Sequence, residues 1–264
     1  MRRPKEWTGM DAIQAAALGI IQGITEWLPV SSEGQSILFM IRHINISPED
    51  TISLAIFLHL GTMFAVLMKF REEFLAILNP NSGILRILAV TATCSGITGI
   101  PCYLALKHSF NSGEGATLII GVMLILTGII LSLPSRRSAH RTREEITTKD
   151  LIITGLVQGF AILPGISRSG VTITTLLLRN VEQKSALAIS FLISVPVVLG
   201  AMLLDIGSIS EVQPVNILVM LVTSFIAGYI TMDVLIRFAE RVNFSLFCIA
   251  LGAITIILAV PGVL

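Results

Sequence analysis

Long uninterrupted apolar runs constrain this chain more than any other feature of its sequence. Examples are LIIGVMLILTGIILSL (118–133) and FCIALGAITIILAV (247–260). A helix needs about 20 apolar residues to cross a bilayer. The stretches of roughly that length lie near 51–70, 84–106, 116–133, 185–205, 214–237 and 244–262. Only 13% of the residues are charged, against about 25% in soluble domains, so the sequence predicts an all-α polytopic membrane protein.

The remaining composition excludes some classes of function. The net charge is +1, which gives no reason to expect nucleic acid as a partner. The chain has three cysteines, Cys94, Cys102 and Cys248. Their odd number and their spacing fit neither a disulfide framework nor a metal site, so we interpret them as small core residues.

Two further regions, 10–43 and 150–180, are apolar but interrupted by proline, glycine and serine. Broken helices are tolerated at membrane depth only where protein or a water-filled cavity covers them. We therefore expect both regions to form re-entrant helical hairpins, which enter and leave the membrane on the same side.

The two interrupted regions resemble each other in sequence. GIIQGITEWLPVSSEG (19–34) aligns without gaps on GLVQGFAILPGISRSG (155–170) at a shift of 136 residues. The identical pairs are Gly19 and Gly155, Gln22 and Gln158, Gly23 and Gly159, Ser31 and Ser167, and Gly34 and Gly170. Chance similarity between two glycine-rich segments is the alternative, but a block of three apolar spans follows each copy and favours duplication.

A hairpin followed by three spans crosses the membrane an odd number of times, so the two halves should have opposite orientations. We expect one integral-membrane domain, 1–264, with inverted repeats at roughly 10–133 and 150–262. The basic loop 134–149 joins them. Sites in membrane proteins of this kind lie where the broken elements of the two repeats meet.

The distribution of basic residues predicts which side faces the cytoplasm. One side collects Lys69, Arg71, Arg86, Arg136, Arg137, Arg141, Arg143, Lys149, Arg179, Lys184, Arg237 and Arg241. The other side has Arg2, Arg3, Lys5, Arg42 and Lys107. Because cytoplasmic loops are enriched in Lys and Arg, we expect loop 134–149 inside and both termini outside a plasma membrane. The basic N-terminus is the one feature that disagrees.

Arg168, in PGISRSG, is the most informative single residue. A cation at membrane depth is costly and should face a cavity or a partner. Guanidinium, hydroxyl and backbone N–H donors converge in this segment and make a compact anion cradle. Alternatively, Arg168 is a structural partner of Glu26, and the two interpretations are compatible.

Glu26 lies in the leading helix of the first hairpin, where an unpaired carboxylate would take up a proton. Arg168 or a metal ion is its natural partner. Ser31 and Ser32 occupy the repeat positions of Ser167 and Arg168, and a serine beside a carboxylate is a candidate nucleophile toward phosphorus. Serine also commonly caps a helix after a turn, and that alternative stays open.

Two other titratable residues have ordinary explanations. His59, in FLHLGT, is an isolated histidine in an apolar span, and such residues are usually satisfied core histidines. Glu33 is expected at the solvated mouth of the first hairpin.

GITEWLPVSSEG together with the distant PGISRSG resembles the two signature motifs of the undecaprenyl-diphosphate phosphatase family, membrane enzymes linked to bacitracin resistance. The resemblance covers essentially the whole chain. It implies a fold of two inverted re-entrant repeats and hydrolysis of a polyprenyl diphosphate to the monophosphate and phosphate, which recycles the lipid carrier of cell-envelope sugars. It also implies a divalent cation, Mg²⁺ or Ca²⁺.

The resemblance assigns roles residue by residue. Glu26, Ser32 and Arg168 match catalytic positions, with Glu26 also a possible metal ligand. Glu33 and His59 do not come from the resemblance and are possible auxiliary residues because of their own acid–base chemistry. The expected substrate-binding residues are Gln22, Ser31, Gly34, Gln35, Gly165, Ser167, Ser169 and Gly170. The expected partners are the lipid diphosphate, the membrane and a second copy of the chain in a homodimer.

Three positions depart from the family pattern. Gln22 stands where the family usually has a glutamate, Gln35 where it has a histidine, and Glu33 where it has a small polar residue. Because a positioned acid or base is worth about 10²–10⁴-fold in rate, the two glutamines could weaken hydrolysis, or Glu26, Glu33 and His59 could supply the missing groups. The alternative function is a polyprenyl-phosphate flippase or scramblase on the same scaffold.

Overall fold

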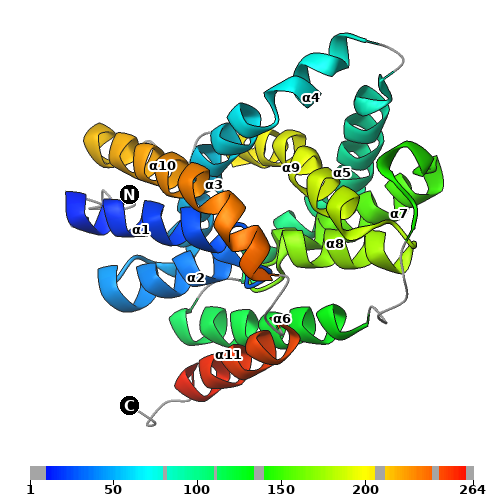
Figure 1. The fold of residues 1–264 in the computed structure, drawn as a ribbon. Helices are drawn as coiled ribbons and strands as arrows, with labels where there is room; N and C mark the ends of the chain where they lie inside the picture. Colours follow the sequence, from blue (N-terminus) through cyan, green and yellow to red (C-terminus); the bar gives the residue numbers. More distant parts are fainter. Residues whose placement is uncertain are drawn as a thin grey trace.

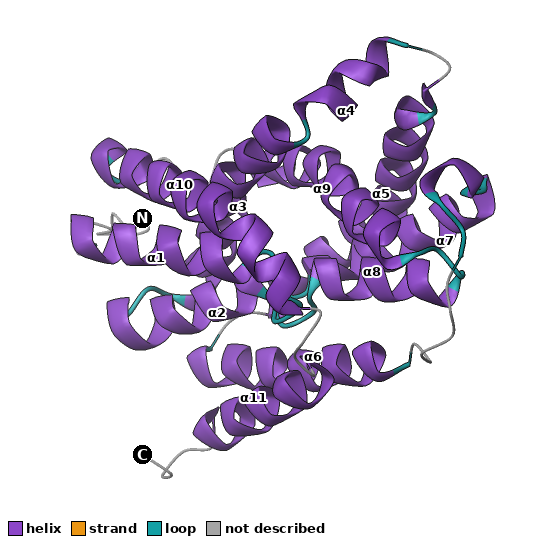
Figure 2. Cartoon of the chain, viewed as in Figure 1, coloured by secondary structure: helices purple, strands orange, loops and turns teal. Residues whose placement is uncertain are grey.

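The computed structural model describes residues 10–79, 82–109, 112–133, 140–205, 212–239 and 244–259. These residues form helices joined by short loops, and they contain no β-strand (Figures 1 and 2). The first half contains α1 (Ala12–Thr25), α2 (Ser32–Phe39), α3 (Pro48–Lys69), α4 (Arg71–Leu75), α5 (Ile84–Ser109) and α6 (Gly113–Ser132). The second half contains α7 (Thr148–Gly159), α8 (Arg168–Leu178), α9 (Gln183–Asp205), α10 (Pro214–Ala239) and α11 (Phe244–Ala259).

Within the described residues, five helices are long and apolar enough to cross a membrane, which confirms a multi-pass membrane protein. They comprise Asp50–Lys69, Ile84–Lys107, Gly113–Ser132, Gln183–Asp205 and Pro214–Val234. The sixth predicted span, 244–262, is not confirmed at that length. Its described part is the 16-residue helix α11, and residues 260–262 lie outside the described residues.

The helices of the two predicted hairpins begin at matching positions. α1 and α7 start 136 residues apart, and so do α2 and α8. Asp11 caps α1 and Thr147 caps α7, each with a reciprocal capping box. Ser31 caps α2 and Ser167 caps α8. Local capping therefore starts the helices at equivalent positions in both hairpins.

The glycines of the repeated motif allow close helix crossings. A Cβ at Gly23 would lie 2.6 Å from Ala227 Cβ in α10, and a Cβ at Gly159 would lie 2.5 Å from Ser95 O in α5. The first helix of each hairpin thus packs on a long helix of the other half. Small residues let helix backbones approach closely where lipid gives no hydrophobic drive between helices.

Equivalent helices of the two halves also pack on each other. α6 and α11 lie side by side (Figure 1), with Gly121 and Gly252 so close that a Cβ at Gly252 would lie 2.6 Å from Gly121 O. Figure 2 places the loops of the two hairpins close together near the centre of the molecule. The inverted orientation across a membrane and the repeat boundaries stay predictions.

Candidate active site

The loops of the two hairpins are joined directly by Ser31. Its backbone is left-handed, with φ of 57°, and its Oγ accepts hydrogen bonds from Gly34 N at 3.2 Å and from Gly165 N at 2.9 Å. Gly165 has φ of 101°, and a Cβ there would lie 2.5 Å from Ile120 O. Only glycine fits this position, because both the backbone conformation and the space exclude a side chain.

Thr127 of α6 fixes the second hairpin loop from the other side. Its Oγ1 donates to Gly165 O at 2.9 Å and accepts from Ser167 N at 3.2 Å. Ser167 in turn caps α8 by accepting from Gly170 N at 3.1 Å. Thr127 is not among the residues that the sequence motifs pointed to, although a hydroxyl in the apolar run 118–133 was a usable signal.

Arg168, the first residue of α8, reaches across to the first hairpin. Its Nη2 forms a hydrogen-bonded ion pair with Glu26 Oε1, and its Nη1 donates to Ser190 O at 3.1 Å. Glu26 is buried. The two charges therefore meet inside the protein, where each lowers the cost of burying the other.

The other carboxylate oxygen of Glu26, Oε2, contacts three side chains. Ser32 Oγ donates to Glu26 Oε2 at 2.6 Å, Gln22 Nε2 donates at 2.9 Å, and His59 Nε2 lies 3.3 Å away. The structure thus brings together five residues that the sequence singled out. It also places a serine hydroxyl in hydrogen-bond contact with a carboxylate, the arrangement expected of a nucleophile and its base.

His59 is oriented by its own helix. Its Nδ1 lies 2.8 Å from Ala55 O, and a carbonyl oxygen only accepts, so Nδ1 carries a hydrogen. That leaves Nε2 facing Glu26. Both ring nitrogens of His59 therefore have partners, as expected of a satisfied histidine, and one partner is the central carboxylate of the site.

Glu33 does not lie at a solvated mouth, which corrects the expectation from sequence. Its relative exposure is 7%, and its Oε1 has no hydrogen-bond partner among the described residues. It lines both cavities described below. Glu33 is buried because the interlocked hairpin loops cover the start of α2, which the linear sequence does not reveal.

The helices α2 and α8 both begin at the site, with Ser32 and Arg168 as their first residues. A helix N-terminus carries a partial positive charge and unsatisfied N–H groups. Two such ends, together with Arg168, create a place suited to a multiply charged anion such as a phosphate.

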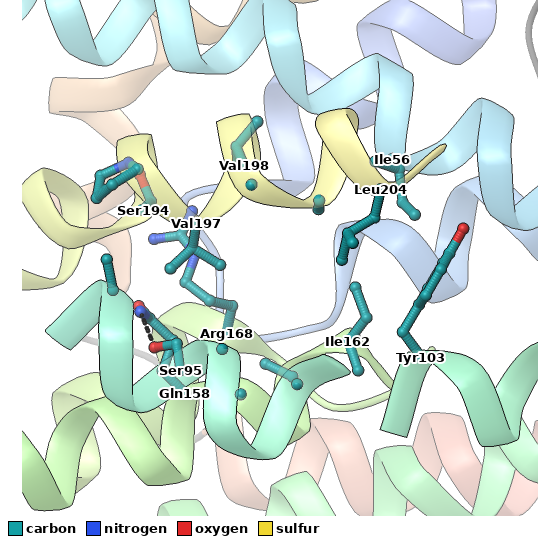
Figure 3. Close-up of a pocket in the computed structure, with 18 of the residues that line it drawn as sticks. Ile56, Ser95, Tyr103, Gln158, Ile162, Arg168, Ser194, Val197, Val198 and Leu204 are labelled. Atoms are coloured by element: carbon teal, nitrogen blue, oxygen red, sulfur yellow. Dashed lines mark hydrogen bonds between the residues drawn. The ribbon is translucent and has the colours of Figure 1, made fainter. Parts of the chain in front are cut away.

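Two cavities that share wall residues lie at these groups. A small cavity is lined by Glu26, Ser31, Ser32, Glu33, His59, Ser167, Arg168 and Ser169, with Leu28, Ala161 and Ile166. A larger cavity of about 250 Å³ shares Glu33, His59 and Arg168 with it and extends along mostly apolar walls from α5 and α9. Figure 3 shows Arg168 pointing into the larger cavity, with Tyr103 and Leu204 farther along it.

Other predicted binding residues have structural contacts. Gln35 Nε2 donates to Val30 O at 3.2 Å, within its own hairpin, so its amide is held by the backbone. Ser169 Oγ approaches Leu28 O at 3.4 Å and Ser167 Oγ at 3.2 Å. Gly34 and Gly170 lie at the crossing of the loops, where a Cβ would have contacts of 3.2 Å.

The chain is similar to known proteins over nearly its whole length. Residues 15–257 match the family described as "Bacitracin resistance protein BacA". A relative from Methanothrix thermoacetophila, named undecaprenyl-diphosphatase, is 53% identical over 96% of this chain and all of its own length.

More distant relatives carry the same name. One from Methanococcoides burtonii is 37% identical over 92% of this chain and 97% of its own length. Another from Carboxydothermus hydrogenoformans is 38% identical over 83% of this chain and 82% of its own length. The resemblance drawn from the paired motifs is confirmed, and the chain belongs to the Bacitracin resistance protein BacA family.

Proposed function

We propose that this chain hydrolyses a polyprenyl diphosphate of the undecaprenyl type to the monophosphate and phosphate, and so recycles the lipid carrier for cell-envelope sugars. One observation carries the proposal. Ser32, Glu26 and Arg168 form a continuous chain of contacts across the two hairpins, which joins a nucleophile, a base and an anion-binding group.

The contacts support a two-step transfer. Ser32 Oγ attacks the terminal phosphorus, a new O–P bond forms, and the bond from that phosphorus to the bridging oxygen breaks. Glu26 takes the hydroxyl proton through the 2.6 Å contact, and the polyprenyl monophosphate leaves with the bridging oxygen. Water then attacks the phosphoserine, which releases phosphate and restores Ser32.

Arg168 links substrate binding to the basicity of Glu26. While it is paired with Glu26, it lowers the carboxylate's affinity for a proton, because an opposite charge favours the ionised form. An incoming diphosphate competes for the same guanidinium. As Arg168 turns toward the phosphate, Glu26 becomes a better acceptor for the Ser32 proton.

The larger cavity suits the first isoprene units of the lipid. Its walls include Ile56, Ile100, Ile162, Val197 and Leu204, and apolar surface gains from contact with hydrocarbon. The cavity shares Arg168 with the polar cavity, so a phosphate at Arg168 would leave its prenyl chain against these walls.

The test is phosphate release by the purified full-length protein from a C55 diphosphate in detergent. We expect release by the wild type and a loss of about 10² or more for Ser32→Ala. Ser132→Ala, an exposed serine at the end of α6, is the matched control and should retain full activity.

The same preparation separates hydrolysis from transport. Movement of lipid phosphate across proteoliposomes without phosphate release would refute the proposal and favour the flippase alternative. The relatives' names favour hydrolysis, and no contact described above favours transport.

We further propose a plasma-membrane location with both termini outside, as the loop charges predict. Cysteines introduced at two exposed positions, His140→Cys and Asn45→Cys, test this in intact cells. An impermeant reagent should label the cysteine at 45 and not the one at 140. The homodimer stays a prediction, and cross-linking of the purified protein would test it.

A further inference from the structure

We propose that Glu33 and the substrate diphosphate together hold a divalent cation in this chain. The inference rests on the proposed function, because the diphosphate supplies the remaining oxygen ligands. It assigns the cation to a residue other than Glu26, the carboxylate that the family resemblance suggests.

Glu26 is poorly suited to be a metal ligand. Among the described residues, Oε1 is paired with Arg168, and Oε2 is contacted by Ser32, Gln22 and His59. A cation at Glu26 would have to displace these donors and then lie next to the Arg168 guanidinium. Both steps are unfavourable, because they break formed hydrogen bonds and bring like charges together.

Glu33 has the opposite properties. It is 93% buried, since its relative exposure is 7%, and its Oε1 has no partner among the described residues. It also lines both the polar cavity and the larger apolar cavity. A buried carboxyl oxygen without a donor is costly, so an oxygen left open in a cavity wall indicates a ligand that arrives from outside.

The site has too little positive charge to balance a bound diphosphate. Arg168 is the permanent cation of the polar cavity, and its charge is already opposed by Glu26. A diphosphate brings two or more negative charges into a region of low dielectric, where uncompensated charge is expensive. A divalent cation next to Glu33 would neutralise both the diphosphate and the Glu33 carboxylate.

The coordination chemistry also fits. Mg²⁺ binds oxygen ligands and is usually held by one or two carboxylates together with substrate phosphates. No group of three His, Cys, Asp or Glu side chains in the described part of the chain could hold a metal by itself. Glu33 would supply one carboxylate ligand and the diphosphate the remaining oxygen ligands. We therefore expect the cation to bind well only when the substrate is present.

Binding of Mn²⁺, followed by electron paramagnetic resonance, tests this without turnover. The probe is a polyprenyl methylenebisphosphonate, whose bridging carbon prevents hydrolysis. We expect the wild type to bind Mn²⁺ tightly only with the probe, and Glu33→Gln to weaken that binding at least tenfold. Glu114→Gln, an exposed glutamate in the first turn of α6, is the matched control and should bind as the wild type does.

Two results would overturn the inference. One is equal Mn²⁺ affinity of Glu33→Gln and the wild type with the probe. The other uses only the wild type and so does not depend on folding of the variant: undiminished phosphate release from C55 diphosphate in excess EDTA. The second result would leave the proposed phosphatase intact, whereas no release with any cation would refute the phosphatase itself.

Discussion

The two hairpins have helices that begin at matching positions, but they carry different side chains where they meet. Ser32 and Glu26 in the first hairpin align with Arg168 and Ile162 in the second. The first hairpin thus supplies a hydroxyl and a carboxylate, and the second supplies a cation and an apolar wall.

The difference follows from the electrostatics of two hairpin loops that meet. The hairpins bring the starts of α2 and α8 together, so identical charged residues at equivalent positions would face each other and repel. Ser32 is neutral at the position equivalent to Arg168, so this repulsion is absent, and Arg168 pairs instead with Glu26. The comparison teaches that two hairpins with helices at matching positions supply the geometry of the site, and that the side chains in which they differ supply the chemistry.

The largest effect should come from removing the cation of the second hairpin. Arg168→Ala should lower phosphate release by about 10³-fold, because it removes the preorganised donors for the phosphate. Arg168→Lys should remain well below the wild type, since an ammonium cannot make the bidentate contact. Full activity in the lysine variant would show that charge alone matters. Thermal unfolding of each variant checks that the fold is retained.

The next effect should distinguish Gln22 from Gln158, the glutamines at equivalent positions of the two hairpins. Gln22 Nε2 donates to Glu26, whereas Gln158 Nε2 donates to Ser95 Oγ at 2.9 Å. Gln22→Glu should raise turnover, because it restores the carboxylate that the family usually has at this position, and a positioned acid or base is worth about 10²–10⁴-fold in rate. Gln158→Glu should not raise turnover, because Gln158 contacts Ser95 and not Glu26. Steady-state kinetics of both variants measures this, and a fall in turnover for Gln22→Glu would contradict the role that the family pattern gives this position.

The close helix crossings at Gly23 and Gly159 should be equally sensitive to substitution. Gly23→Ala and Gly159→Ala should each destabilise the protein by about 1–3 kcal/mol through overpacking, because each new Cβ would collide with a helix of the other half. Unfolding in detergent, monitored by circular dichroism, gives the two values. A large cost at one position only would show that the crossings differ in tightness.

The smallest effect concerns the stability of the protein in acid, and it depends on Asp150 in the first turn of α7. Asp150 is fully buried. Burial alone would raise the pKa of its carboxyl group, but hydrogen bonds from Arg141, Arg179 and Thr147 outweigh it and hold the pKa well below its usual range. Its counterpart in the first hairpin is the neutral Gln14.

Because the folded-state pKa of Asp150 is lowered, its stabilisation is present above the ordinary pKa of about 4 and is lost as the pH falls further. Thermal unfolding of wild type and Asp150→Asn should differ at pH 7, and the difference should shrink below about pH 4. Gln14→Glu should show no comparable dependence. A difference as large at pH 2 as at pH 7 would mean that packing, rather than charge, holds this end together.

Much of this protein followed from the sequence because membranes restrict the choice of structure. The five long helices and both interrupted regions could be placed from apolar length and from proline, glycine and serine alone, since backbone groups in lipid must be paired within the helix. The pairing of Glu26 with Arg168 was also predictable, because a buried charge requires a partner. Capping was an alternative role for the serine pair that contains Ser31, and the structure shows it for Ser31.

Only the tertiary structure decided the surroundings of those residues. The burial of Glu33, the contact of His59 with Glu26 and the role of Thr127 depend on which helices cross over the hairpin loops. The larger cavity likewise depends on how α5 and α9 are spaced. Side chains far apart in the chain set these features, and their distances follow from packing, which local sequence patterns do not encode.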